Sequence, residues 1–292
     1  MEVIQHETMQ PRGAHNYKQG ALYAAIVVGT FLSGITTAFR CYTRWKAAKR
    51  LRKDDWLMCV GLFWSFAVIA AIAHGLTVGL GDDVLNTDYD KKWLLRTSAA
   101  VLMMQNLCVF FVKTSILCFN MGIFRGQTFK RVAWAVLVVT AVNSFTGFLI
   151  AFLQELAICP RADKQCFGES KYVVPLTTAI IATVCDIVIY IMPIPLLARL
   201  GVDRRTKIGL CVVFLLGLLC IGTSFARWAA MIQDHPNNGI SMPSDIRISL
   251  WTYVELSAGI TCGNLPILAP LIGLVNTENT HAITVAPLFY WE

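Results

Sequence analysis

Seven long apolar stretches, separated by short charged segments, divide this sequence of 292 residues. A transmembrane α-helix needs roughly 20 apolar residues to cross the hydrocarbon core of a bilayer, and each stretch is long enough. A transmembrane barrel would instead show alternating segments of about 10 residues, and the sequence has no such pattern. The fold class predicted is therefore all-α, a seven-transmembrane helix bundle. Its spans are expected at residues 20–39, 56–80, 93–124, 132–156, 173–198, 208–232 and 246–274.

Charged side chains make up 15% of the sequence, whereas a soluble domain usually carries about 25%. Lipid rather than water is therefore expected to contact most of the surface, and we predict a multi-pass protein with the lipid bilayer as its main partner. The net charge of +7 does not indicate nucleic acid, because no basic stripe with interleaved aromatic residues is present. Residues 1–19 are polar and lack the apolar core of a signal peptide, so the first span is expected to be a retained anchor.

The distribution of Lys and Arg predicts the orientation. Fourteen of these residues follow the first, third and fifth spans, and eight lie on the other side of the membrane. Because cytosolic segments carry the excess of positive charge, the N-terminus is expected outside and the C-terminus in the cytosol. The predicted domains are an outer tail at 1–19, a membrane domain at 20–274 and a short cytosolic tail at 275–292. The basic segments 125–131 and 199–207 would then be available to a cytosolic partner.

Two of the ten cysteines, Cys159 and Cys166, lie in the segment expected outside the membrane between the fourth and fifth spans. An oxidising compartment favours a disulfide between them, and two unpaired thiols are the alternative. Zinc is not expected, because the segment has no His and only one Cys pair. We predict no metal site. The other eight are interpreted as small apolar packing residues: Cys41, Cys59, Cys108, Cys118, Cys185, Cys211, Cys220 and Cys262.

Several ionisable side chains fall inside the predicted spans, where charge is costly and usually faces a partner or a cavity. A rise of about 1.5 Å per residue places five of them in the outer half of the bundle. These are Arg227, Glu255, Glu155, Arg96 and His74. His74 is interpreted as an interface residue rather than a ligand residue.

Lys113 and Asp186 lie deeper, towards the cytosolic half, and two interpretations of all these charges stay open. In the first, Lys113–Asp186 and Arg227–Glu255 are structural pairs that hold helices together. In the second, the outer residues bind a small molecule. The candidate ligand-binding residues are then Arg227, Glu255, Arg96, Gln105 and Asn106. An enzyme would use Glu255 and Glu155 as acid and base, with Arg227 as an electrostatic stabiliser.

Residues of known cofactor and catalytic motifs are missing from the sequence. A retinal Schiff base needs a lysine in the bundle, but 246–274 contains none and Lys113 is the only lysine within a predicted span. The third span does not end in the Asp-Arg-Tyr triplet of ordinary G-protein-coupled receptors. No Walker loop, GxSxG, HExxH or dinucleotide fingerprint is present. No cofactor is therefore expected.

Two carboxylates, Asp54 and Asp55, stand immediately before the second span. In that position they would cap the free N–H groups of the helix and complement its dipole. They could also pair with Arg40 or Arg44, which follow the first span.

The chain resembles the fungal rhodopsin-like integral membrane proteins, a group that includes receptor-like fungal pathogenicity proteins and membrane proteins of mycotoxin gene clusters. The resemblance covers nearly the whole chain and depends on several short motifs in a fixed order. They are Arg40-Cys41-Tyr42-Thr43-Arg44, Asp54-Asp55-Trp56, Lys113-Thr114-Ser115-Ile116-Leu117, Ile123-Phe124-Arg125, Asp186 with Pro193-Ile194-Pro195, Gly217 with Arg227, and Trp251, Glu255, Gly259, Pro266 and Pro270.

The resemblance implies a receptor-like protein that senses or acts on a lipophilic small molecule within a secondary-metabolite pathway, without retinal. The alternatives are a membrane-embedded cyclase or isomerase that uses the buried carboxylates, and a metabolite transporter. The short segment after Leu274 favours a pathway role over classical signalling.

Overall fold

The computed structural model describes residues 12–78, 88–123, 126–155, 170–192, 204–233 and 242–274. Within these ranges the chain forms seven α-helices and no strand, as the pattern of apolar stretches predicted. The helices are α1 (Arg12–Ala48), α2 (Lys53–Val78), α3 (Asp88–Ile123), α4 (Gln127–Glu155), α5 (Ser170–Ile191), α7 (Arg204–Gln233) and α8 (Met242–Leu274).

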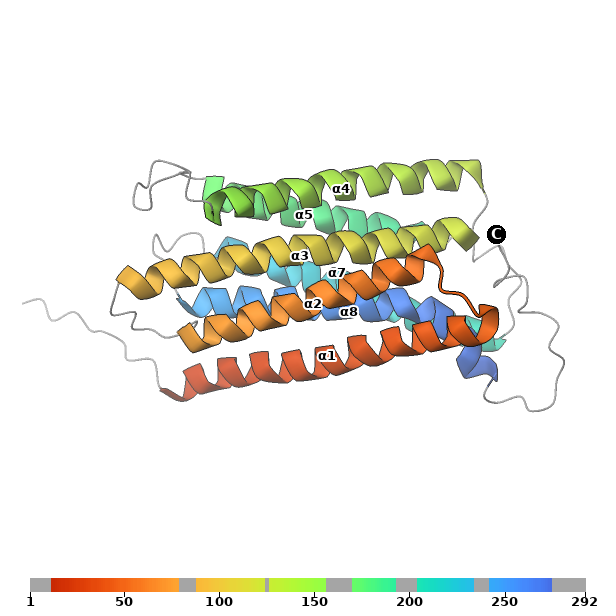
Figure 1. Cartoon of the computed structure of the whole chain (residues 1–292), viewed down its shortest axis with the longest axis horizontal. Coiled ribbons are helices and arrows are strands. Elements are labelled where there is room, and N and C mark those ends of the chain that lie inside the picture. The colour runs from red at the N-terminus through yellow and green to blue at the C-terminus, as the bar shows by residue number, and fades with distance from the viewer. Residues whose placement is uncertain are drawn as a thin grey trace, which may run out of the picture.

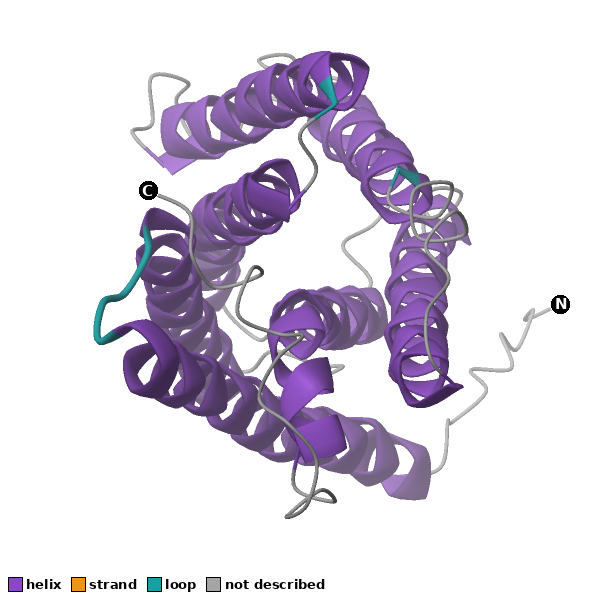
Figure 2. Cartoon of the chain, turned by 90° about the vertical axis from the view of Figure 1, so that its right-hand side faces the viewer, coloured by secondary structure: helices purple, strands orange, loops and turns teal. Residues whose placement is uncertain are grey.

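Successive helices run in opposite directions, so α1 begins at one end of the bundle and α8 ends at the other (Figure 1). Each helix packs against the next in sequence, and α8 returns to α1 to close the bundle. Figure 2 shows this closed arrangement along the helix axes. α8 also contacts α2 and α3, so it occupies the most enclosed position among the described helices.

The outward faces of the bundle are apolar, which is the arrangement expected in lipid. Val27, Phe31, Phe63 and Phe145 each expose more than 60% of their surface. Five helices, α1 to α4 and α7, are long and apolar enough to cross a membrane, and α5 contributes a shorter apolar segment, Pro175–Ile191. The protein is therefore a multi-pass membrane protein.

Helix α8 carries buried polar side chains over 247–267, the part whose side chains the structure describes. Its polar side chains face the other helices rather than lipid, and Thr252, Glu255, Thr261 and Asn264 are all buried. A helix shielded by its neighbours does not need an apolar surface all round. Between α1 and α8, the Asn264 amide donates to Thr37 Oγ1 at 2.9 Å.

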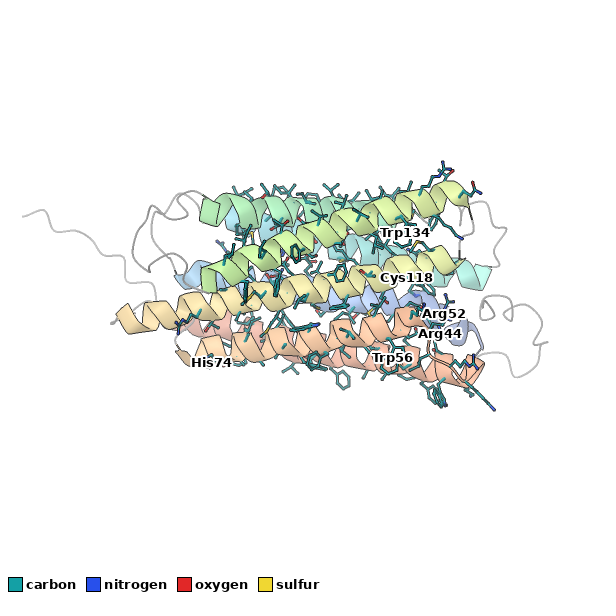
Figure 3. The ribbon with its side chains drawn as sticks, turned by 45° about the horizontal axis from the view of Figure 1, so that its top comes forward. Arg44, Arg52, Trp56, His74, Cys118 and Trp134 are labelled. Atoms are coloured by element: carbon teal, nitrogen blue, oxygen red, sulfur yellow. The ribbon has the colours of Figure 1, made fainter. Side chains whose placement is uncertain are left out.

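The first helix continues well beyond residue 39, where the sequence predicted its span to end. Arg40 and Arg44 therefore lie inside α1 and are buried, not in a loop as expected. The apolar run ends at residue 39, but the helix continues, because the guanidinium groups of Arg40 and Arg44 form ion pairs with carboxylates on α2. Figure 3 shows Arg44 and Arg52 at the same end of the bundle, opposite to His74.

Arg40 is completely buried and forms the centre of an ionic network. Its Nη2 lies 2.9 Å from Asp54 Oδ2, and its Nε lies 2.8 Å from Asp55 Oδ1. Its Nη1 donates to the backbone oxygen of Gly263 on α8 at 3.1 Å. The backbone oxygen of Asp54 in turn accepts a 2.6 Å hydrogen bond from Ser115 on α3. A single side chain thus connects α1 with α2 and α8, and through Asp54 with α3.

The capping role predicted for the acidic pair is also present. Asp55 Oδ2 accepts a hydrogen bond from the backbone N–H of Arg52 at 3.0 Å, at the first turn of α2. The same carboxylate therefore caps α2 and neutralises Arg40. The sequence indicated capping and, in addition, pairing with an arginine, and the two oxygens of this carboxylate perform both roles.

Replacing Arg40 by Gln should lower the free energy of unfolding by about 3–5 kcal/mol, because Asp54 and Asp55 lose their main buried partner. Arg52→Gln is the matched control, since Arg52 Nε also contacts Asp54, at 3.2 Å, but its side chain is 30% exposed. Its loss should be below about 1 kcal/mol. The free energy of unfolding of both variants is measured on the solubilised protein, with dye labelling of buried thiols as the signal for unfolding. Equal losses of stability in the two variants would contradict the central role of Arg40.

Candidate functional site

A cavity of about 40 Å³ lies between α3, α4, α5 and α7. Three residues named from the sequence as ligand-binding candidates, Gln105, Asn106 and Arg227, line it together. The rest of the lining is Leu102, Gly147, Ile150, Ala151, Pro175, Thr178 and Met231. Polar and apolar groups contribute about equally to the lining, and the volume is enough for a small polar group. The ligand-binding role of the three residues stays a prediction.

Arg227 connects the cavity to α8 through Glu255. Its Nε lies 2.8 Å from Glu255 Oε2, and its Nη2 donates to Oε1 at 3.3 Å. Oε1 also accepts a 2.8 Å hydrogen bond from Ser224 on α7. The Nε–Oε2 contact has the distance of an ion pair without the alignment of a hydrogen bond. Both side chains are only 8% exposed, so this pair is buried.

Gln105 provides an unpaired polar group in the cavity. The residue is 5% exposed, and its amide forms no hydrogen bond with the residues that the structure describes. Its neighbour Asn106 is held in place, because Nδ2 donates to the backbone oxygen of Leu102 at 2.8 Å. The amide atoms of Gln105 are not among the fully enclosed atoms that lack a partner, so they stay accessible from the cavity and can bind a polar group there.

The α4 and α5 walls of the cavity depend on small and turn-forming residues. A Cβ atom at Gly147 would lie 2.8 Å from both amide atoms of Asn106, so only glycine allows α4 to approach α3 this closely. On α5, the Thr178 hydroxyl donates to the backbone oxygen of Pro175 at 2.9 Å. The backbone oxygen of Thr178 accepts a bond from Asn143 of α4 at 3.1 Å, which joins the two walls.

A second ion pair, largely shielded from the surface, connects α3 and α5. Lys113 Nζ lies 3.0 Å from Asp186 Oδ1 and donates to the backbone oxygen of Ala182 at 2.8 Å. Neither Lys113 nor Asp186 lines the cavity.

The structure does not bring Arg96 into the cavity. Its side chain is exposed, whereas the sequence indicated only its depth in the outer half, so its ligand-binding role stays a prediction. The reason for the exposure is rotation about the helix axis: Arg96 precedes Gln105 by nine residues, about two and a half turns, so it faces the opposite side of α3.

The remaining candidates from the sequence are His74, Glu155 and the Cys159–Cys166 pair. His74 is exposed near the end of α2 (Figure 3). Glu155 ends α4, but its side chain lies outside the described residues. The predicted Cys159–Cys166 disulfide also falls outside them.

Sequence reasoning missed Ser224, Gly147, Pro175 and Thr178. Ser224 stands three residues before Arg227, one helical turn away, so helical spacing alone could have placed it near Glu255. Glycine and proline within a long apolar span are a weaker signal for the other positions, because they also occur in spans without a site.

Comparison with known proteins identifies the family. The profile described as "Fungal rhodopsin domain" matches residues 39–274, so the chain belongs to the fungal rhodopsin domain family. It is similar to the curated protein "Receptor GIN3" of Arthrobotrys oligospora, with 24% identity over 261 residues. The match covers 84% of this chain and 60% of that relative, so the chain spans about 60% of the relative's length. No solved structure matches the chain.

Removing one member of the Arg227–Glu255 pair should destabilise the protein more than removing both charges. Arg227→Met leaves a buried carboxylate without its cation and should cost about 3–5 kcal/mol. The double variant Arg227→Met/Glu255→Gln should regain most of this loss, because Ser224 can still donate to the Gln oxygen. Thermal unfolding in detergent measures the difference, and a double variant no more stable than Arg227→Met would contradict it.

Proposed function

We propose that this fungal rhodopsin domain protein is a receptor-like membrane protein, and that its cavity binds the polar end of a lipophilic small molecule. The observation that carries the proposal is the buried Gln105 amide, which lines the cavity next to Arg227 and has no protein partner in the described chain. A ligand oxygen or N–H that reaches Gln105 would satisfy this group, and the volume of about 40 Å³ suits the polar end of the molecule.

The charges around the cavity favour a neutral polar group over an ionised one. Arg227 is already neutralised by Glu255, whose two oxygens lie within 3.3 Å of the guanidinium or of Ser224. An anionic ligand would have to displace Glu255 from this buried pair and leave its carboxylate unpaired, at a cost of several kcal/mol. A hydroxyl, carbonyl or amide group needs no such exchange, so alcohols, ketones and amides are the classes we expect.

The same contacts argue against the enzyme alternative. A general acid or base must reach the reacting atom, and Glu255 does not line the cavity. Its oxygens are engaged by Arg227 and Ser224, which hold it as a paired carboxylate. The name of the relative "Receptor GIN3" supports a receptor as well.

A route from the cavity to the opposite end of the bundle runs along α8. Glu255 contacts Arg227, and Asn264, nine residues and about 14 Å further along the same helix, contacts Arg40 and Thr37. A ligand that moves Arg227 would therefore act on α8, and through it on the ionic network. The positive-charge distribution assigns that end to the cytosol, where the basic segments would meet a partner.

The host fungus offers a direct test between sensing and metabolism. Strains carrying the intact gene, a deletion or Gln105→Leu would be compared for metabolite profile and for transcriptional response to their own lipophilic culture extract. The proposal expects Gln105→Leu to lose the response like the deletion, with no intermediate accumulating. Accumulation of one intermediate in both mutant strains would support the secondary-metabolite pathway role, as an enzyme or transporter, and would overturn the receptor proposal.

Narrowing the cavity without removing a polar group should also weaken the response. Gly147→Ala pushes the Asn106 amide towards the cavity, because the new Cβ would lie 2.8 Å from it. We expect the extract concentration for half-maximal response to rise at least tenfold, about 1.4 kcal/mol in binding. Gly222→Ala is the control, since a Cβ there meets no atom within 4 Å. Identical dose–response curves for the two variants would contradict the location of the site.

A further inference from the structure

Cys41 of α1 and Cys59 of α2 lie against each other. Their Sγ atoms are 3.6 Å apart in a thiol–thiol hydrogen bond, and neither cysteine is in a disulfide. The sequence indicated only apolar packing for both. Cys108 shows how a packing thiol is satisfied elsewhere in the bundle, since its Sγ donates to the backbone oxygen of Gly61 at 3.2 Å.

We propose that Cys41 and Cys59 form a dithiol modification site that a hydroperoxide oxidises to a disulfide. One thiol, as its thiolate, attacks the peroxide O–O bond and becomes a sulfenic acid, and the peroxide is released as water or an alcohol. The second thiol then attacks the sulfenic sulfur, which forms the S–S bond and releases water. Two S–H bonds are lost, and the peroxide oxygen pair is reduced by two electrons.

The geometry suits both steps. Either sulfur can accept the S–H of the other, so a thiolate at one position already has a hydrogen-bond donor beside it. The resolving thiol is in contact with the sulfur that would be oxidised, and an adjacent resolving cysteine is typical of redox-sensitive thiols. A disulfide needs an S–S distance of about 2.05 Å, and the two side chains start at 3.6 Å, in van der Waals contact.

The surroundings of the pair indicate the class of oxidant. Both cysteines are half-buried, and the aromatic side chains nearby in sequence, Tyr42, Trp45 and Trp56, are 60–62% exposed on the outer surface of the helices. Cys59 lies six residues inside α2, about 9 Å from its first residue. An uncharged oxidant that enters the bilayer, such as hydrogen peroxide or a lipid hydroperoxide, can reach this position. An oxidant that is itself a charged disulfide would have to leave water and enter the bilayer to reach the two cysteines.

Oxidation would affect the part of the fold that the ionic network holds. Cys41 follows Arg40 directly, and Cys59 stands one turn after Asp55 on the same face of α2. A disulfide would fasten α1 to α2 beside the Arg40–Asp55 ion pair, which is itself 2.8 Å long. The oxidised protein should therefore resist thermal unfolding better than the reduced protein. The site is separate from the cavity and does not depend on the receptor proposal.

The test uses the full chain in lipid nanodiscs, treated with hydrogen peroxide, alkylated and digested without reductant. Mass spectrometry should detect the peptides of Cys41 and Cys59 linked and two hydrogens lighter than their sum, and dithiothreitol should separate them. The midpoint of thermal unfolding should rise on oxidation. Cys41→Ala and Cys59→Ala should each abolish the rise, whereas Cys118→Ala, at a half-buried cysteine of α3, should retain it.

Oxidation of Cys41 or Cys59 to sulfinic acid without the linked peptide would overturn the proposal. So would an unchanged rise of the unfolding midpoint in Cys41→Ala. The linked peptide is sought in the wild-type chain, so this result decides the matter even if an alanine variant does not fold.

Discussion

The buried guanidinium of Arg40 is the constraint that most of the bundle satisfies. A charge inside a membrane protein is tolerated only when partners surround it, and Arg40 draws these partners from different helices. Asp54 and Asp55 come from α2, and the Gly263 oxygen comes from α8. Since each partner must meet one fixed side chain, the rotation and axial position of α1, α2 and α8 are set together. The Ser115 bond to the Asp54 oxygen extends this constraint to α3.

Two further ion pairs connect other helices of the bundle. Lys113–Asp186 joins α3 to α5, and Arg227–Glu255 joins α7 to α8. Of these four residues, only Arg227 lines the cavity. The Gln105 amide, which also lines the cavity, has no hydrogen-bond partner in the described chain, so the cavity has a polar group available to a ligand.

The sequence predicted the helices well and the cavity only in part, for a reason specific to membrane proteins. Long apolar runs show the approximate depth of a residue, and on this basis Gln105, Asn106 and Arg227 were named as candidates; all three line the cavity. Rotation about the helix axis is much less visible when a span is apolar all round, so depth alone did not show that Arg96 is exposed. The contact between Cys41 and Cys59 depends on the rotation of two helices at once. The continuation of α1 through Arg40 was missed because its carboxylate partners come from another helix.

The polar surface of α8 has a consequence for how the protein is made. Glu255, Thr261 and Asn264 make the insertion of this segment into lipid less favourable than that of a fully apolar span. Its partners on α1, α2, α3 and α7 all precede it in the sequence. Insertion of α8 should therefore wait until those helices have assembled a slot that accepts its polar groups. A variant that disturbs the packing site for α8, for instance at Arg40, would then impair membrane insertion during biosynthesis, and the nascent chain would be degraded by quality control.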